Sequence, residues 1–506
     1  MENNDNQPMR LGPKGLISKQ ELVKLIIQCL NSLGYDASAI SLESQSHISY
    51  RTPPFDLLER QILLGDWESL TLAVFQDIRD DIRAIVLFLT IRQFIVECVI
   101  RGDDATALGI LRKDFSALGL RQDRIAPIAY IIIAKNKIGG PGGLGDIDDG
   151  VIVEMRRDLV SRLEELILAP NRRLECLVEK ALDAQRSSCT YHNLEDSISL
   201  YEDHHSCGKV YFPTETLQIL THHTDEVWYI QFSNNGEYLA SGSSDFQTII
   251  WQVWENGNLI LRQRLRGHQS PVYFVSWSPD DTKLLTCGYH VLKFWEVNTG
   301  RLICTFLEQS AILSSCAWFP NSEGLIFGCS GPNRRKHMYK FDDKSFIELS
   351  GSDNPMAGNV ATASNSNFIC FFTRNEIFIQ DVGKLGMNTE RKITENSEIT
   401  SVCVSKDGNH LIVNLNNQEI HVWDTAGKLV KPLVYQGHKQ ARFVIHSCFG
   451  GLDSMFIASG SEDSQVYIWN RQSSKPIEIL SGHSMVVNCV SWNPKRHYML
   501  ASASDD

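Results

Sequence analysis

Apolar residues follow two different periods along the chain, and the change between them falls near residue 190. Before that point they recur three and four positions apart, which is the period of amphipathic helices. After it, short runs rich in Val, Ile and aromatic residues are separated by turns, as β-strands are. The pattern therefore predicts an all-α region followed by an all-β region.

The helical region opens with two predicted helices. Ser18 and Glu21 form a capping box ahead of the first, Gly34 ends it, and a second helix carries Ala39 and Leu42. This stretch, residues 16–50, resembles the LisH motif, whose members dimerise. Two short helices cannot bury their own apolar face, so we expect a second copy to cover it; packing on the next helices of the same chain is the alternative. The residues expected to dimerise are Leu22, Ile26, Leu30, Leu33, Tyr35 and Leu42.

Further amphipathic helices are predicted over residues 55–64, 67–75, 82–100 and 105–115, joined by Gly-Asp or Asp-Asp turns. The segments around Phe55, Asp66 and Phe94 resemble a CTLH domain over residues 51–112, and residues 113–188 resemble its CRA-type helical extension. The longest apolar runs, residues 84–91 and 125–134, are shorter than the ~18 residues of a membrane span, so we interpret both as buried helices. Residues 138–150 are glycine-rich without the Lys of a phosphate loop, which favours a flexible loop.

The β-rich region contains a repeat. Its period is about 40–45 residues, which is the signature of propeller blades, and we expect a seven-bladed β-propeller over residues 215–506. The residues that mark it are Trp251, Trp295, Tyr339, Gln380, Trp423 and Trp469. Gly-His pairs and Ala-Ser-Gly-Ser segments recur around these positions, and together they resemble the WD-repeat family.

The resemblance implies two structural tetrads, in which hydrogen bonds tie the segment entering a blade to its middle strands. A buried carboxylate needs such partners, so the matched sets indicate fold and not catalysis. The second blade lacks the Asp, since Tyr289 and His290 occupy its turn. The expected tetrads are His223, Ser241, Asp245 and Trp251, and His438, Ser459, Asp463 and Trp469.

The last repeat stops at Asp506, before its third strand. In propellers of this type an extra strand before the first blade, here residues 215–220, completes the last blade. We therefore expect the last blade to be incomplete, with unpaired backbone groups, in a chain that is a fragment or a short isoform.

Two clusters of polar residues are candidate binding sites. In the expected linker, residues 189–214, Cys189, His192, His204 and Cys207 have residue types and spacings that suit zinc, but the favoured interpretation is a polar connector without metal. A basic cluster of Arg334, Arg335 and Lys336 at a hairpin of the third blade is the candidate partner-binding site; a solvated turn is its alternative.

Composition and charge disfavour several classes of function. The chain has 506 residues and a net charge of -12 spread over both halves, which disfavours nucleic-acid binding. Its start, residues 1–15, is expected to be disordered and lacks the basic and apolar character of a signal peptide. The 13 cysteines lack a Cys-x-x-Cys pair and are typical of a reducing compartment, so a cytoplasmic or nuclear protein without membrane partners is expected. No local motif of an enzyme is present, and we expect neither catalysis nor a cofactor.

The order LisH, CTLH, CRA-like helices and WD-repeat propeller is similar to the WD-repeat protein 26 family, whose yeast counterpart is the seventh subunit of the glucose-induced degradation ligase. The resemblance implies a non-catalytic scaffold and substrate-recruiting subunit of a CTLH-type ubiquitin ligase, a homodimer or higher oligomer whose partners are other CTLH subunits and protein substrates or an adaptor. Trp423-Asp424-Thr425-Ala426 lacks the Arg of propellers that dock on cullin adaptors. The alternatives are a Topless-like corepressor and an adaptor for G-protein βγ subunits.

Overall fold

A computed structural model describes residues 10–67, 80–117, 149–195, 198–202, 205–307, 312–318, 324–330, 336–342, 345–350, 359–361, 368–381, 391–427, 429 and 431–506. The chain divides into two compact units, residues 1–183 and 184–506. Among the helices that it describes, none combines the length and the apolar character needed to cross a lipid bilayer.

The helical unit begins with a two-stranded sheet, β1 (Arg10–Leu11) and β2 (Ile17–Ser18), and the helices α1 (Lys19–Ser32) and α2 (Asp36–Ser46). Ser18 caps α1 by accepting a hydrogen bond from the Glu21 backbone N–H at 3.4 Å, as the capping box predicts. Gly34 follows the helix with φ +81°, a conformation that favours glycine. The predicted two-helix start is confirmed.

The rest of this unit comprises α3 (Pro53–Leu64), α4 (Asp80–Arg101), α5 (Asp104–Ala117), α7 (Asp149–Ile167) and α8 (Arg173–Ser188), which runs into the second unit. Residues 84–91 lie within α4, as predicted, but the segment is only partly buried: Val86 and Thr90 are buried, while Ile85 is 42% exposed. The predicted helix over residues 67–75 lies outside the described residues beyond Trp67, and so do residues 125–134 and 138–148.

A buried ion pair holds this unit together. The Arg156 guanidinium on α7 donates to both carboxylate oxygens of Glu97 on α4, at 2.9 and 2.6 Å. Glu97 also accepts from Trp67 Nε1 at 3.1 Å and from the Gln93 side chain at 3.2 Å. Burial raises the pKa of Glu97, but these donors together outweigh burial and lower it. Apolar side chains of α3, α4 and α7 pack beside the pair: Phe55, Leu58, Ile62, Val86, Leu159, Val160 and Leu163.

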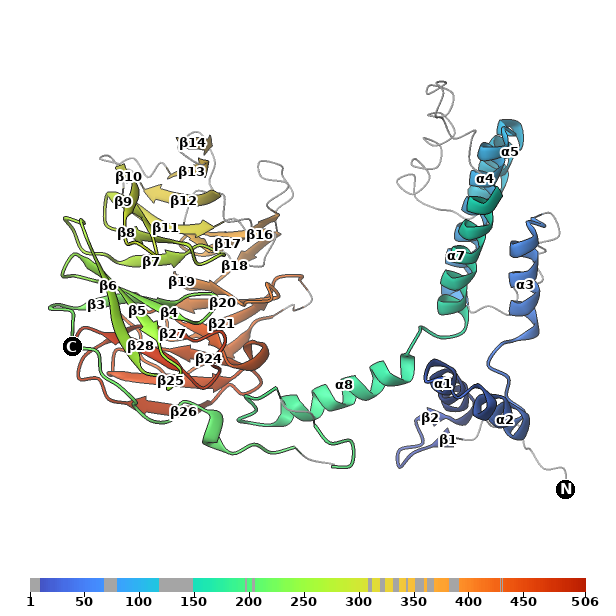
Figure 1. Ribbon diagram of the computed structural model, residues 1–506, viewed down its shortest axis with the longest axis horizontal. Helices are drawn as coiled ribbons and strands as arrows, with labels where there is room; N and C mark the ends of the chain where they lie inside the picture. Colours follow the sequence, from blue (N-terminus) through green and yellow to red (C-terminus); the bar gives the residue numbers. More distant parts are fainter. Residues whose placement is uncertain are drawn as a thin grey trace. The chain divides into compact units, whose positions relative to one another are not determined.

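The second unit is built from consecutive antiparallel sheets (Figure 1). The four-stranded sheets are β3 (Val227–Phe232), β4 (Tyr238–Ser243), β5 (Gln247–Val253), β6 (Leu259–Arg266); β7 (Phe274–Trp277), β8 (Lys283–Cys287), β9 (Val291–Glu296), β10 (Leu302–Leu307); β11 (Ile312–Trp318), β12 (Gly324–Ser330), β13 (Lys336–Asp342), β14 (Ser345–Ser350); β15 (Asn359–Ala361), β16 (Phe368–Phe372), β17 (Glu376–Asp381), β18 (Arg391–Thr394); β19 (Ile399–Val404), β20 (His410–Leu415), β21 (Ile420–Asp424), β22 (Leu433–Tyr435); and β23 (Cys448–Gly450), β24 (Phe456–Ser459), β25 (Gln465–Asn470), β26 (Pro476–Ser481). A two-stranded sheet, β27 (Val487–Trp492) and β28 (Leu500–Ser504), follows, and 3-10 turns lie at Lys209–Tyr211 and Leu452–Ser454.

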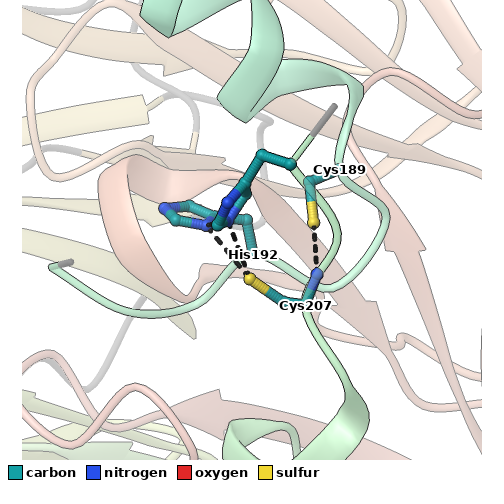
Figure 2. A group of neighbouring side chains, drawn as sticks. Cys189, His192 and Cys207 are labelled. Carbon is teal, nitrogen blue, oxygen red and sulfur yellow. Dashed lines mark hydrogen bonds between the residues drawn. The ribbon is translucent and has the colours of Figure 1, made fainter. Parts of the chain in front are cut away.

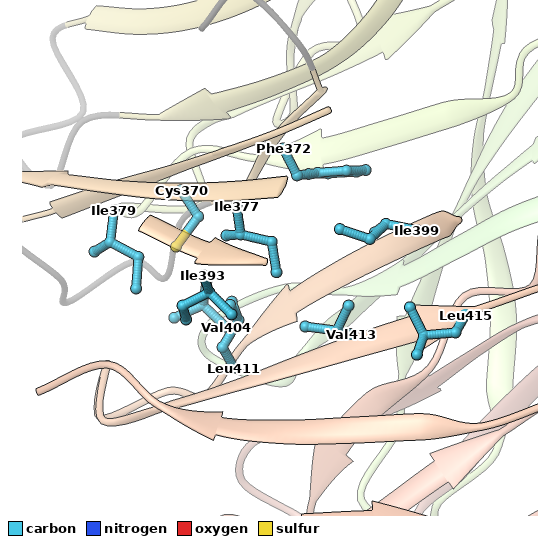
Figure 3. Packing of buried hydrophobic residues seen from close by; sticks show 10 residues of the cluster. All are labelled: Cys370, Phe372, Ile377, Ile379, Ile393, Ile399, Val404, Leu411, Val413 and Leu415. Carbon is cyan, nitrogen blue, oxygen red and sulfur yellow. The ribbon is translucent and has the colours of Figure 1, made fainter. Parts of the chain in front are cut away.

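These sheets form a propeller-like ring. The first strand of each sheet lies against the first strand of the next, and β27 lies against β3. The ring closes through specific contacts: Ser491 accepts from the Phe232 N–H, and Asn493 donates to Gly236 O. Apolar side chains fill the space between neighbouring sheets, as Figure 3 shows for the fourth and fifth: Cys370, Phe372, Ile377, Ile379, Ile393, Ile399, Val404, Leu411, Val413 and Leu415.

The last sheet has two strands, and the extra strand that was expected to join it is not formed. Its two strands, β27 and β28, agree with an incomplete last blade, while the number of complete blades stays a prediction. The strand expected over residues 215–220 is not formed, and this prediction was wrong for this chain. A strand needs a neighbour that satisfies its backbone groups. β28 pairs with β27, and β27 also makes an isolated parallel bridge from Cys489 to His446, so the described residues place no third strand beside β28 with which residues 215–220 could pair.

Candidate functional site

The first predicted tetrad is formed as expected. His223 hydrogen-bonds Asp245 Oδ2 at 2.9 Å through Nδ1 and Ser241 Oγ at 2.8 Å through Nε2, and Trp251 Nε1 donates to Ser241 Oγ at 3.0 Å. Burial lowers the pKa of His223; it opposes ionisation of Asp245 too, yet the hydrogen bonds from His223 and backbone N–H groups lower the pKa of Asp245 overall. The network ties the segment before β3 to β4 and β5.

Two further sheets carry parts of the same network. In the second, His268 Nε2 hydrogen-bonds Thr286 Oγ1 at 2.7 Å, and Trp295 Nε1 donates to that oxygen at 2.8 Å. Thr286 thus replaces the serine, a substitution that the sequence analysis missed. In the last sheet, His483 contacts Ser502 Oγ at 2.8 Å and Asp506 Oδ1 at 3.1 Å.

The second predicted tetrad is not formed, so this prediction was wrong. Trp469 Nε1 donates to Gln436 O at 3.2 Å and Ser459 Oγ donates to Gly460 O at 2.9 Å. Asp463 Oδ2 accepts from the Tyr467 hydroxyl at 2.9 Å. Ser459 and Trp469 lie on the neighbouring strands β24 and β25, and His438, which precedes the sheet, contacts Trp469 edge-to-face, at 5.8 Å between centroids.

The fifth sheet uses a different buried acid. Glu395, 5% exposed, accepts from Trp423 Nε1 at 2.6 Å and hydrogen-bonds His421 Nδ1 at 2.9 Å. Burial lowers the pKa of His421, but Glu395 and Glu419 together raise it. Nothing in the repeat pattern pointed to Glu395, because it precedes the marker Trp423 by 28 residues instead of following a turn.

A cavity of about 460 Å³ opens where the first strands of the sheets converge. Tyr229 stands in its wall, against Phe274 with ring centroids 4.7 Å apart and against His446 at 4.9 Å. Burial lowers the pKa of His446 to about 4. The lining combines aromatic side chains with a few polar groups, as ligand and peptide pockets do. The remaining described lining residues are Glu226, Trp228, Tyr273, Phe372, Thr400, Ser401, Val402, Phe443, Val444, Asn488 and Asp505.

One edge of this cavity is a fixed apolar loop. Phe443 and Val444 are 46% and 53% exposed. The Glu462 carboxylate holds the loop by accepting from the backbone N–H groups of Ala441, Arg442 and Phe443 at 2.7, 2.7 and 3.0 Å. Burial opposes the ionised form, but these donors lower the pKa of Glu462. An anchored loop with exposed apolar side chains is suited to bind a partner.

The predicted dimerisation residues divide into two groups. Leu33 and Tyr35, each 59% exposed, extend into solvent with Ile40, which is 65% exposed. Leu22, Ile26, Leu30 and Leu42 are half-buried. The opposite side of α1 packs within the unit, where the buried Gln28 donates to Pro170 O at 2.9 Å. Part of α1 therefore packs in cis, and an apolar face remains accessible.

The structure describes one residue of the predicted basic cluster and brings together three residues of the predicted Cys/His cluster. Arg334 and Arg335 lie outside the described residues, and Lys336 begins β13 opposite Ser330, so the basic cluster stays a prediction. In the linker, Cys189, His192 and Cys207 come together, and the fourth member is His205 (Figure 2). His204, which the spacing suggested, lies outside the described residues.

Comparisons with known proteins cover both units. Residues 8–52 match the model described as the WDR26 Lis-homology domain, and residues 214–252, 260–296, 429–470 and 474–506 match the WD domain, G-beta repeat. The chain is 47% identical to the WD repeat-containing protein WDS homolog of Arabidopsis thaliana, over 98% of this chain and 95% of that protein. It is 38% identical to the WD repeat-containing protein 26 homolog of the same plant, over 98% and 84%. It is 32% identical to GID complex subunit 7 of Schizosaccharomyces pombe, over 96% and 95%.

Proposed function

The chain belongs to the WD-repeat protein 26 family, and on that premise we propose that it is a non-catalytic scaffold subunit of a GID/CTLH-type ubiquitin ligase complex. The observation that carries the proposal is the match to GID complex subunit 7, which extends through both the helical unit and the propeller. A match to the propeller alone would support only a general binding module, since propellers host many functions.

We assign a different role to each of the two units. The helical unit presents Leu33, Tyr35 and Ile40 to solvent, and we assign this face to self-association. The propeller holds substrates or an adaptor at its cavity, with Phe443 and Val444 at the edge. Joining a self-associating unit to a binding ring displays several binding sites together and raises the effective concentration of a bound partner. We place the complex in the cytoplasm or nucleus.

Affinity purification of the full chain from its own cells, followed by mass spectrometry, tests the proposal. We expect other subunits with LisH and CTLH segments in the eluate, together with ubiquitin-ligase activity. Recovery of G-protein βγ subunits or of transcriptional repressors in their place would contradict it and favour the signalling or corepressor alternative.

Two variants separate the candidate partner surfaces of the propeller. Phe443→Ala removes the aromatic contact at the cavity edge, and a triple variant neutralises Arg334, Arg335 and Lys336. If partners bind at the cavity, Phe443→Ala loses the propeller-bound protein while retaining the CTLH subunits. Loss only in the triple variant would move the partner site to the third sheet.

A further inference from the structure

The segment that leads into the propeller contains a compact group of metal-ligating side chains. One atom each of Cys189, His192, His205 and Cys207 lies within 4.8 Å of the others. His192 Nδ1 lies 2.8 Å from His205 Nε2, and these nitrogens lie 3.4 and 2.9 Å from Cys207 Sγ. Figure 2 shows the three labelled side chains converging, with the backbone N–H of Cys207 directed at Cys189 Sγ at 3.2 Å.

We propose that these four residues bind one structural Zn²⁺ ion. At zinc bond lengths of about 2.0–2.1 Å to nitrogen and 2.3 Å to sulfur, tetrahedral ligand atoms lie roughly 3.3–3.8 Å apart. One observed separation, 3.4 Å, falls in this range, the other two, 2.8 and 2.9 Å, are shorter, and all four ligand atoms lie within 4.8 Å, so small side-chain movements would complete the site. Two thiolates and two imidazoles are the Cys₂His₂ set of closed structural sites. Soft sulfur and imidazole donors select zinc over the oxygen-seeking Mg²⁺ and Ca²⁺.

The charge balance suits the location. Binding releases one proton from each thiol, and the two thiolate charges cancel the charge of Zn²⁺, leaving a neutral site. Cys189 and His192 are only 4% and 1% exposed, so an uncompensated ion would be costly there. The Cys207 N–H supports the Cys189 thiolate, as outer hydrogen bonds do in metal sites.

The first half of the site is fixed by the propeller. The buried Asn193 donates to Tyr211 O at 2.7 Å and to His497 O at 2.6 Å, and its Oδ1 accepts from the Leu452 N–H at 3.1 Å. Asn470 on β25 donates to Thr190 O at 3.2 Å. Cys189 and His192 thus each directly precede an anchored residue, Thr190 and Asn193 respectively.

The second half of the site, His205 and Cys207, is followed by residues that also contact the sheets. After Cys207, Lys209 pairs with Glu478 at 2.5 Å, and Phe212 packs edge-on against Phe456 with centroids 5.0 Å apart. Before Cys189, Arg186 at the end of α8 pairs with Asp453 at 3.2 Å. A metal joining Cys189 to Cys207 would therefore lock residues 189–212 onto the sheets and fix the point where α8 ends. This role is independent of the proposed ligase assembly.

Metal analysis of the full chain, produced with zinc in the medium and purified without chelator, tests the proposal. We expect about one zinc per chain by elemental analysis and by native mass spectrometry. Protein loaded with Co²⁺ should show the visible spectrum of a tetrahedral site with thiolate ligands. Wild-type protein without zinc, with Cys189 and Cys207 either reactive as thiols or joined in a disulfide, would overturn the proposal.

Variants test the assignment of the ligands. His205→Asn and Cys207→Ser should each reduce zinc to below about a fifth of an equivalent. His204→Asn removes the histidine next to His205 in the sequence, and Cys176→Ser removes a thiol on α8 that is not among the four residues; we expect both variants to retain the metal. Zinc that survives His205→Asn but not His204→Asn would overturn this ligand set. Hydrogen exchange of residues 189–212 should rise in the zinc-free variants and stay unchanged in the controls.

Discussion

The Tyr467 hydroxyl donates to Asp463 Oδ2 at 2.9 Å and occupies the carboxylate that the repeat pattern assigned to His438. In the first sheet the residue four positions after the turn aspartate is Ile249, which has no hydroxyl, and there Asp245 bonds His223. The Tyr467 ring also stacks on Trp469, with an interplanar angle of 22°. Tyr467 thus engages one oxygen of the Asp463 carboxylate in a contact that the first sheet lacks.

Removing the serine hydroxyls should expose this difference between the two sheets. Ser241→Ala leaves the buried Trp251 N–H without its acceptor and His223 Nε2 without the hydroxyl it contacts, so we expect a loss of about 1–3 kcal/mol in the unfolding free energy. Ser459→Ala removes one hydroxyl that bonds only the neighbouring Gly460 O, and it should cost about 1 kcal/mol or less. Urea unfolding of the full chain, followed by tryptophan fluorescence, measures both. Equal losses would argue against the two different networks.

The buried ion pair of the helical unit should be its most sensitive point. Glu97→Ala leaves the Arg156 guanidinium, whose side chain is 8% exposed, without its carboxylate. We expect the helical unit to lose about 3–5 kcal/mol, measured by thermal unfolding with circular dichroism. Asp158→Ala breaks the Arg162 pair on α7, in which both side chains are 60% exposed, and should cost at most about 0.5 kcal/mol. A Glu97→Ala protein as stable as this control would refute the assignment.

The fold was predictable where a local signal and the tertiary structure agree. The capping box at Ser18 and the glycine at position 34 place α1 correctly, because caps depend on residues close in sequence. The repeat of buried aromatic residues likewise identified the propeller, since each blade must bury the same face. The prediction failed where one side chain, such as Tyr467, competes for a partner, because the family pattern does not include that position.

The candidate sites depend on contacts between residues whose spacing in the sequence does not predict that they meet. His204 and His205 are neighbours in the sequence, and spacing alone does not single out His205, whose Nε2 lies 2.9 Å from Cys207 Sγ. Glu395 lies in the short connection between β18 and β19, and the packing of that connection against the fifth sheet brings it to Trp423 on β21. The loop at Phe443 owes its shape to Glu462, 19 residues further along, a relationship without any sequence periodicity.

The accessible face of the first two helices predicts the oligomeric state. Leu33→Asp places a charge on a side chain that is 59% exposed, so the fold should survive while a dimer contact is lost. We expect a dimer or larger species in light scattering for wild-type protein and a monomer for the variant. Leu64→Asp is the control, since Leu64 is 69% exposed on α3, outside this motif. A monomeric wild-type protein would mean that self-association does not use this face.

The buried histidines predict how the propeller responds to acid. Burial lowers the pKa of His268, His438 and His446 from 6.5 to about 4. Between pH 6.5 and about 4 the unfolded chain binds protons that the folded chain does not, so stability falls as pH falls. Each histidine contributes up to roughly 3 kcal/mol to this loss.

A matched pair of variants isolates this effect. His268→Gln cannot titrate, so the unfolding midpoint of this variant should decline less steeply between pH 6.5 and 4 than that of the wild type. His421 has a raised pKa and behaves in the opposite sense: it stabilises the fold fully below pH 6.5, and this contribution is lost as pH rises. His421→Gln should therefore flatten the pH dependence above 6.5 and leave the acid limb in place. Identical acid limbs for wild type and His268→Gln would exclude His268 as a source of acid sensitivity.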